Sequence, residues 1–212
     1  MSNNKNTSKN MNCIVVLDRS GSMECCVDDT IGGFNQFVAE QAKSGGTLTL
    51  YLFDHELIKV HDKVPIESVE RMTRQTYIPR GSTALFDAIG CAIKTIAPSE
   101  ANTTTVVILT DGEENSSRQY RTKAHIKDLV EMSTAKGVTF LYLAANQDAF
   151  KEGNGFGIQS DNIMEFDTQT QCREAFRSAA NCINSRSNGQ HTPLTPQRII
   201  VIPDADSQTL EY

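Results

Sequence analysis

The sequence lacks the long apolar runs that carry a protein into or across a membrane. Nowhere in its 212 residues do about eighteen apolar residues follow one another, as a membrane-spanning helix requires. The first twelve residues, MSNNKNTSKNMN, are polar and hold no apolar run that would serve as a signal peptide. We therefore expect a soluble, cytoplasmic protein without a membrane partner.

Positive charge is also scarce. The net charge is -6, and no basic cluster is longer than two residues. Nucleic-acid binding usually rests on lysine and arginine side chains that neutralise phosphates. The composition therefore argues against a nucleic-acid partner.

The cysteines and histidines lack the spacing of a zinc site. Six cysteines and four histidines are scattered along the chain without the paired arrangement that zinc needs. We expect reduced thiols. The adjacent Cys25 and Cys26 leave two interpretations open, a redox element or small half-buried residues of a loop, and the second is favoured because no resolving partner follows.

The sequence does contain enough apolar residues, 39%, for one sizeable core. Apolar runs of strand length alternate with segments of helical period from Cys13 to about Ile183, which is typical of an α/β domain with a mainly parallel sheet. We predict a flexible N-terminal segment at 1–11, one domain at 12–184, and a linker with a C-terminal tail at 185–212.

Three continuous apolar runs indicate strands that are covered on both faces: 13–17, 105–109 and 138–145. We expect them to lie centrally in a doubly wound, Rossmann-like sheet of about six strands with helices on both faces. The segment 57–64 alternates apolar and polar residues and follows the run 47–53 after only three residues, so it predicts an antiparallel edge strand. A short strand is expected near 162–166.

Four segments repeat apolar residues at intervals of three and four, the pattern of a helix with one face on a sheet. They are 31–42, 85–96, 126–133 and 172–183. After Ile183 the composition changes to serine, asparagine, proline and glycine, which indicates a linker. The apolar run RIIVI at 198–202 leaves three alternatives open: a strand added to this sheet, a strand offered to a partner, or an apolar tail.

Polar side chains gather where three of these elements begin or end. They are Asp18, Ser20 and Ser22 in DRSGS, Thr83 in GSTAL, and Asp111 in LTDG. In open α/β sheets ligands bind outside the carboxyl ends of the strands. We therefore expect two carboxylates and several hydroxyls from three separate loops to converge on one spot.

All of these side chains offer hard oxygen atoms, which suit Mg²⁺ or Ca²⁺, with Mn²⁺ as a laboratory substitute. Mg²⁺ commonly keeps waters, so one position would stay open to a carboxylate of another molecule. Each motif alone also reads as an ordinary structural element, either a loop, a turn or a helix N-cap. Their occurrence together, in order and at the ends of elements, favours a site.

Four stretches carry a resemblance to a known family: VVLDRSGSM, GFNQFVAEQ, YIPRGSTALFDAIG and VVILTDGEENSS. They resemble the von Willebrand factor type A (VWA) domain, in the compact intracellular form found in bacteria and their phages. The likeness covers roughly Met11 to Ile183. It implies a metal-ion-dependent adhesion site, whose serines, threonine and aspartates touch the metal directly or through water.

By this resemblance the metal ligands are Asp18, Ser20, Ser22, Thr83 and Asp111. The neighbouring Ser82, Glu113 and Glu114 are not counted as ligands. We expect the two glutamates to tune the approach of a partner instead.

The resemblance implies a protein-binding module without enzymatic activity, in which a bound Mg²⁺ is completed by an Asp or Glu of a partner such as an AAA+ ATPase or an assembly component. One alternative is a Mg²⁺-dependent hydrolase, which needs a nucleophile or activated water and usually a cation. Only Arg19 and Arg80 flank the loops closely enough to supply that cation. The other alternative is a scaffold that binds no metal.

Overall fold

A six-stranded sheet organises the part of the chain that the structure, a computed structural model, describes: residues 11–145, 148–168 and 171–194. The strands are β1 (Asn12–Asp18), β2 (Thr47–Phe53), β3 (Leu57–Pro65), β4 (Thr104–Thr110), β5 (Thr139–Ala145) and β6 (Ile163–Phe166). They lie in the order β3-β2-β1-β4-β5-β6, and every neighbouring pair is parallel except β2 and β3. The predicted mainly parallel sheet with one antiparallel edge strand is confirmed.

The burial of the central strands follows from their apolar patterns. Every residue of β1 and β4 is buried, and both strands lie inside the sheet, as their continuous apolar runs predict. On the edge strand β3, Ile58 and Val60 are each 42% exposed. This strand is half-exposed, as predicted for an edge strand, but its burial does not follow the alternation, because the apolar Ile58 and Val60 are themselves exposed.

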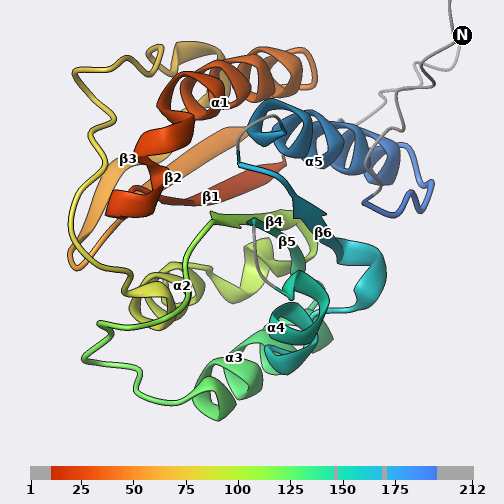
Figure 1. The fold of residues 1–212 in the computed structure, drawn as a ribbon. Helices are drawn as coiled ribbons and strands as arrows, with labels where there is room; N and C mark the ends of the chain where they lie inside the picture. Colours follow the sequence, from red (N-terminus) through yellow and green to blue (C-terminus); the bar gives the residue numbers. More distant parts are fainter. Residues whose placement is uncertain (1–10, 146–147, 169–170, 195–212) are drawn as a thin grey trace, which may run out of the picture.

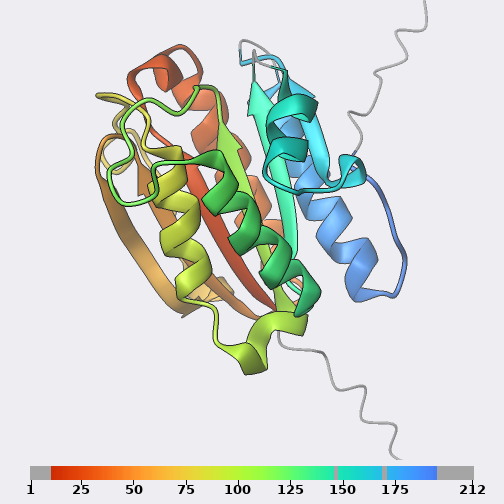
Figure 2. The ribbon, with the colours of Figure 1, turned by 90° about the horizontal axis from the view of Figure 1, so that it is seen from below.

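Helices cover both faces of the sheet (Figure 1). Helices α1 (Val27–Ala42) and α5 (Cys172–Ser187) pack on one face, and α2 (Leu85–Lys94), α3 (Lys123–Ala135) and α4 (Ala149–Gly155) pack on the other, as Figures 1 and 2 show together. Strand β1 serves both layers, because Val15 and Leu17 belong to the core under α1 and α5 while Ile14 and Val16 belong to the opposite core. The doubly wound architecture is thus confirmed.

Helix α4 was not expected from the sequence. Its seven residues, AFKEGNG, have no helical apolar period and include two glycines, which are poor helix formers. Tertiary contacts stabilise it instead. The Asp148 side chain accepts the backbone N–H of Lys151, and Gly153 lies so close to β6 that an added Cβ would be 2.6 Å from Cδ1 of Ile163.

The carboxyl-terminal part of the described chain is held against the domain. Helix α5 ends at Ser187, and beyond it Leu194 is buried, with its N–H donated to the carbonyl of Asp161. The run 198–202 and the first ten residues lie outside the described residues, so the division into 1–11, 12–184 and 185–212 stays a prediction. Within the described residues, no helix is both long and apolar enough to cross a lipid bilayer.

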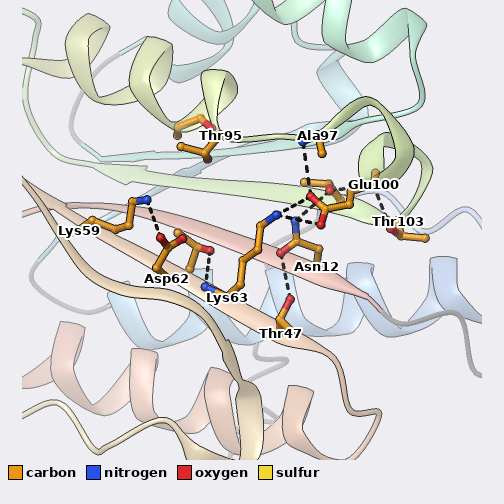
Figure 3. Close-up of polar contacts among 12 residues, drawn as sticks. Asn12, Thr47, Lys59, Asp62, Lys63, Thr95, Ala97, Glu100 and Thr103 are labelled. Carbon is orange, nitrogen blue, oxygen red and sulfur yellow. Dashed lines mark hydrogen bonds and ion pairs between the residues drawn. The ribbon is translucent and has the colours of Figure 1, made fainter.

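Side-chain contacts tie the strands together at the amino end of β1 (Figure 3). The Asn12 amide donates to the Thr104 hydroxyl and accepts from the Thr47 hydroxyl, each at 3.1 Å, so it bridges β4 and β2. Nearby, Lys63 of β3 pairs with Glu100 at 2.8 Å. The polar groups at this end of the sheet are therefore engaged with one another and link neighbouring strands.

Candidate metal centre

The three loops that carry the motifs DRSGS, GSTAL and LTDG meet at the carboxyl ends of β1 and β4. Because these strands pair in parallel with Leu17 opposite Leu109, their last residues, Asp18 and Thr110, are neighbours. The Asp18 side chain is completely buried. Its Oδ2 accepts the Thr110 hydroxyl at 2.5 Å, and its Oδ1 accepts the N–H of Ser20 at 2.6 Å, which fixes the orientation of the carboxylate.

Loop 1 (19–22) and loop 3 (111–117) bring three more of the expected ligands together. The Oγ atoms of Ser20 and Ser22 lie 3.1 Å apart, and the Ser22 hydroxyl donates to Oδ1 of Asp111 at 2.6 Å. Ser20 is buried, whereas Ser22 is exposed and Asp111 is partly exposed. The cluster is therefore buried on the side of Ser20 and open to solvent on the side of Ser22 and Asp111.

Thr83, on loop 2 (79–84), completes the cluster from the other side of Gly112. A Cβ built on Gly112 would lie 2.9 Å from Oγ1 of Thr83 and 3.7 Å from Oγ of Ser20, so a side chain here would fill the space between them. The Thr83 N–H donates to the Asn115 side chain, and its carbonyl accepts the N–H of Asn115. The structure thus brings together all five side chains that the sequence singles out.

Among the residues that the structure describes, neither Asp18 nor Asp111 has a cationic partner. Burial raises the pKa of Asp18 to about 6, despite hydrogen bonds from Thr110 and Ser20 that lower it, and burial also raises the pKa of Asp111. In the part of the chain that the structure describes, no ion pair involves either of them. Two carboxylates and three hydroxyls without a thiolate or imidazole are a donor set that fits a hard divalent cation.

Tyr77, in the long segment between β3 and α2, supports the site from within the core. Its hydroxyl donates to the Asp18 carbonyl at 2.6 Å. The same segment is anchored on α1, because the Asn35 side chain both donates to the Met72 carbonyl and accepts the Met72 N–H. No local sequence signal marks these contacts, which join residues far apart in the chain.

The adjacent cysteines next to loop 1 lie in different surroundings. All six cysteines of the chain are free thiols. Cys26 is buried in the core, and the exposed Cys25 donates its thiol to the Ser22 carbonyl at 3.3 Å. Both lie in the 3-10 helix η1 (Gly21–Cys26) rather than in an irregular loop, and the choice between a redox element and structural residues stays a prediction.

Glu114 requires a correction, because its carboxylate faces inward rather than toward a partner. It accepts the N–H groups of Phe86, Ser116 and Ser117 at 2.7–2.9 Å and the Ser117 hydroxyl at 2.7 Å. Helix α2 has no side-chain cap of its own at Ala84, so Glu114 supplies the acceptor at this N-terminus. The side chain therefore fastens loop 3 to α2, while the role of the exposed Glu113 stays a prediction.

We expect Glu114→Ala to lower the free energy of unfolding by about 1–3 kcal/mol, because it leaves partly buried N–H donors without an acceptor. Urea unfolding of the variant and of wild type measures the difference. Glu113→Ala removes the neighbouring exposed carboxylate and should stay within about 0.5 kcal/mol of wild type. Equal losses in the two variants would contradict the inward role of Glu114.

A second acidic cluster lies in the turn between β2 and β3. Ligand atoms of Asp54, His55 and Glu56 come within 4.8 Å of one another. However, Oδ2 of Asp54 lies 3.0 Å from Nη2 of Arg19 and 2.9 Å from Nε of Arg80, and Glu56 accepts from Arg80 at 2.6 Å. Two arginines already neutralise these carboxylates, so the turn does not favour a metal ion. The sequence offered a signal for Asp54, since it directly follows a predicted strand.

Solved structures share this fold at low sequence identity. The proximal thread matrix protein 1 of the mussel byssus, in a structure with a zinc-occupied MIDAS motif, is 14% identical with a TM-score of 0.60, over 82% of this chain and 48% of that one. Manganese-loaded TRAP protein of Plasmodium vivax is 15% identical, with a TM-score of 0.58, over 76% and 70%. The vWF domain of the pili tip protein Mfa5 from Porphyromonas gingivalis is 11% identical, with a TM-score of 0.62, over 87% and 98%. This chain spans about half the length of the mussel protein.

The family follows from the sequence itself. No curated protein matches the sequence. A family model described as VWA domain containing CoxE-like protein matches residues 2–156, which is more than half of the chain. That stretch includes all three motif loops and five of the six strands. The chain therefore belongs to the family of VWA domain-containing CoxE-like proteins.

Proposed function

We propose that this chain is a metal-dependent protein-binding module. A divalent cation is held by Asp18, Ser20, Ser22, Thr83 and Asp111, and a carboxylate of a partner protein completes its coordination. The observation that carries the proposal is the convergence of these oxygen donors from three loops, with two carboxylates that have no cationic partner in the described structure.

The ion-loaded neighbours support the choice of a metal. The mussel protein holds zinc at its MIDAS motif and the Plasmodium protein is loaded with manganese, and both share this fold. For this chain we propose Mg²⁺ as the resident ion, with Mn²⁺ or Ca²⁺ as substitutes, because all donors are hard oxygens. The bound ion would act as a Lewis acid that a carboxylate oxygen of the partner coordinates.

The burial pattern supports the direction of approach. Asp18, Ser20 and Thr83 are buried, whereas Ser22 is exposed and Asp111 is partly exposed. A carboxylate of another molecule therefore has access from the side of Ser22 and Asp111. Such a charged contact in a partly desolvated rim provides orientation and specificity, while the surrounding surface provides most of the contact area.

The hydrolase alternative loses support from the two arginines beside the loops. Arg19 is 8% exposed and, like Arg80, is paired with Asp54, so neither guanidinium is at hand to stabilise developing charge. We therefore propose a module without enzymatic activity. The proposal includes a cytoplasmic location and, through the family resemblance, a partner such as an AAA+ ATPase or an assembly component.

The test uses Mn²⁺ as the ion and acetate as the carboxylate. We expect Mn²⁺ bound to the protein to enhance water-proton relaxation, and acetate to reduce the enhancement by replacing a bound water. Acetamide at equal ionic strength should leave it unchanged, because it lacks the negative charge. If Mn²⁺ does not bind, or if acetate and acetamide act alike, the proposed function is wrong.

We expect Thr83→Ala to weaken Mn²⁺ binding by about tenfold, since one neutral interaction of about 1–1.5 kcal/mol is lost. Thr83→Ser keeps the hydroxyl and serves as the matched control. It should bind within about threefold of wild type, which electron paramagnetic resonance of free Mn²⁺ measures directly. Equal binding by all three proteins would remove Thr83 from the ligand set.

A further inference from the structure

We propose that Asp54 is a positioning residue for the metal centre, which sets the cation affinity by neutralising Arg19 and Arg80. The inference rests on the proposed function. Asp54 lies on none of the three motif loops: it is the first residue after β2, and its side chain is completely buried.

Asp54 joins the two loops that flank the site. Its Oδ2 lies 3.0 Å from Nη2 of Arg19, on loop 1, and 2.9 Å from Nε of Arg80, on loop 2. Backbone bonds run in parallel with these contacts, because the Arg80 N–H donates to the Arg19 carbonyl and the Ala84 N–H donates to the Asp54 carbonyl, each at 2.8 Å. A single carboxylate thus connects the segments that carry Asp18 and Thr83.

The orientation of the Asp54 carboxylate is itself determined. Its Oδ1 accepts the backbone N–H of Glu56 at 2.7 Å, which leaves Oδ2 directed at the two arginines. Glu56 also pairs with Arg80, but from the exposed side of the turn. The buried Asp54 and the exposed Glu56 therefore offer a matched pair of carboxylates on the same ion-pair network.

The charges explain why this matters for a cation. Arg19 stands between Asp18 and Ser20 in the chain and is buried, so its positive charge is poorly screened by water. Without Asp54, the buried Arg19 would carry uncompensated charge, and Arg80 would keep only its exposed partner Glu56. They would repel a divalent cation and compete with it for the carboxylates of the site. Asp54 prevents this by pairing with both.

The test compares Mn²⁺ dissociation constants of the full chain by electron paramagnetic resonance. We expect Asp54→Asn to weaken binding by about tenfold, which corresponds to about 1.4 kcal/mol of repulsion between the unpaired arginine and the cation. Glu56→Gln should stay within about threefold of wild type. The double variant Asp54→Asn with Arg80→Gln should regain part of the lost affinity, because it removes one of the two cations that Asp54 pairs with in wild type. A merely structural role would give no such recovery.

The outcomes separate this inference from the function on which it rests. If wild type does not bind Mn²⁺, the proposed function is wrong. If wild type binds Mn²⁺ and Asp54→Asn binds it with the same dissociation constant, only the role of Asp54 is wrong. Weak binding without recovery in the double variant also overturns it. If circular dichroism shows that Asp54→Asn does not fold, Arg80→Gln alone is the test. The Arg80 side chain is 46% exposed, so the variant should fold. Its Mn²⁺ binding should be tighter than that of wild type, and weaker binding would contradict the inference.

Discussion

We expect replacement of Asp18 with asparagine to abolish the stabilisation that divalent cations should give to this protein. In wild type, Mg²⁺ or Mn²⁺ at about 100 times its dissociation constant should stabilise the native state by about 2.7 kcal/mol. For a chain of 212 residues this raises the melting temperature by roughly 5–10 °C, and EDTA should reverse the shift. The Asp18→Asn variant should show no shift, because it removes a negative charge from the buried side of the site.

Asparagine is the informative replacement because it keeps the shape of the side chain. Its carbonyl oxygen can still accept the Ser20 N–H, and its amide can face the Thr110 hydroxyl, so the metal-free protein should fold. Asp62→Ala is the control, since Asp62 is an exposed β3 carboxylate paired with Lys59 (Figure 3). Differential scanning fluorimetry with and without Mg²⁺ compares them. A full shift in Asp18→Asn would exclude Asp18 as a ligand.

Truncation of Phe176 to alanine should lower the free energy of unfolding by about 3–5 kcal/mol, the range for a buried aromatic side chain. Phe176 is completely buried on α5 and packs against two rings of α1, with centroids 6.1 Å from Phe34 and 5.9 Å from Phe37. These contacts hold the last helix to the first across one face of the sheet. Removal of the ring leaves a cavity between them.

Urea unfolding followed by circular dichroism measures this loss. Phe150→Ala is the matched control, because Phe150 on α4 is 43% exposed and should change the stability far less. A loss below about 1 kcal/mol for Phe176→Ala would show that α5 contributes little to the core. Such a result would contradict the packing of α5 on the sheet.

The sheet was predictable because burial on both faces demands continuous apolar sequence. The runs 47–53 and 57–64 coincide closely with β2 and β3, and only the second contains charged residues, as suits an exposed edge strand. Helix α4 was not predictable, because its stability comes from contacts of Gly153 with β6 and not from its own period. Local pattern thus determines the strands better than a short helix.

The expected ligands were predictable for a similar reason. Asp18 and Asp111 follow apolar strands directly, so the rule on the carboxyl ends of parallel strands applies to them. The same rule marks the position of Asp54 but not its partners. Asp54 contacts Arg80 across 26 positions and Glu114 contacts Phe86 across 28, so only the folded chain shows which groups they pair with.

The position of a bound manganese ion is the most direct test of the proposed centre. Crystals of the full chain soaked in Mn²⁺ give an anomalous difference map in which the ion is identified by its own scattering. We expect one strong peak within about 2.5 Å of oxygens of Asp18, Ser20, Ser22, Thr83 or Asp111, or of waters that these side chains hold. A peak at Asp54, His55 and Glu56 instead, or no peak at saturating Mn²⁺, would contradict the proposed metal centre.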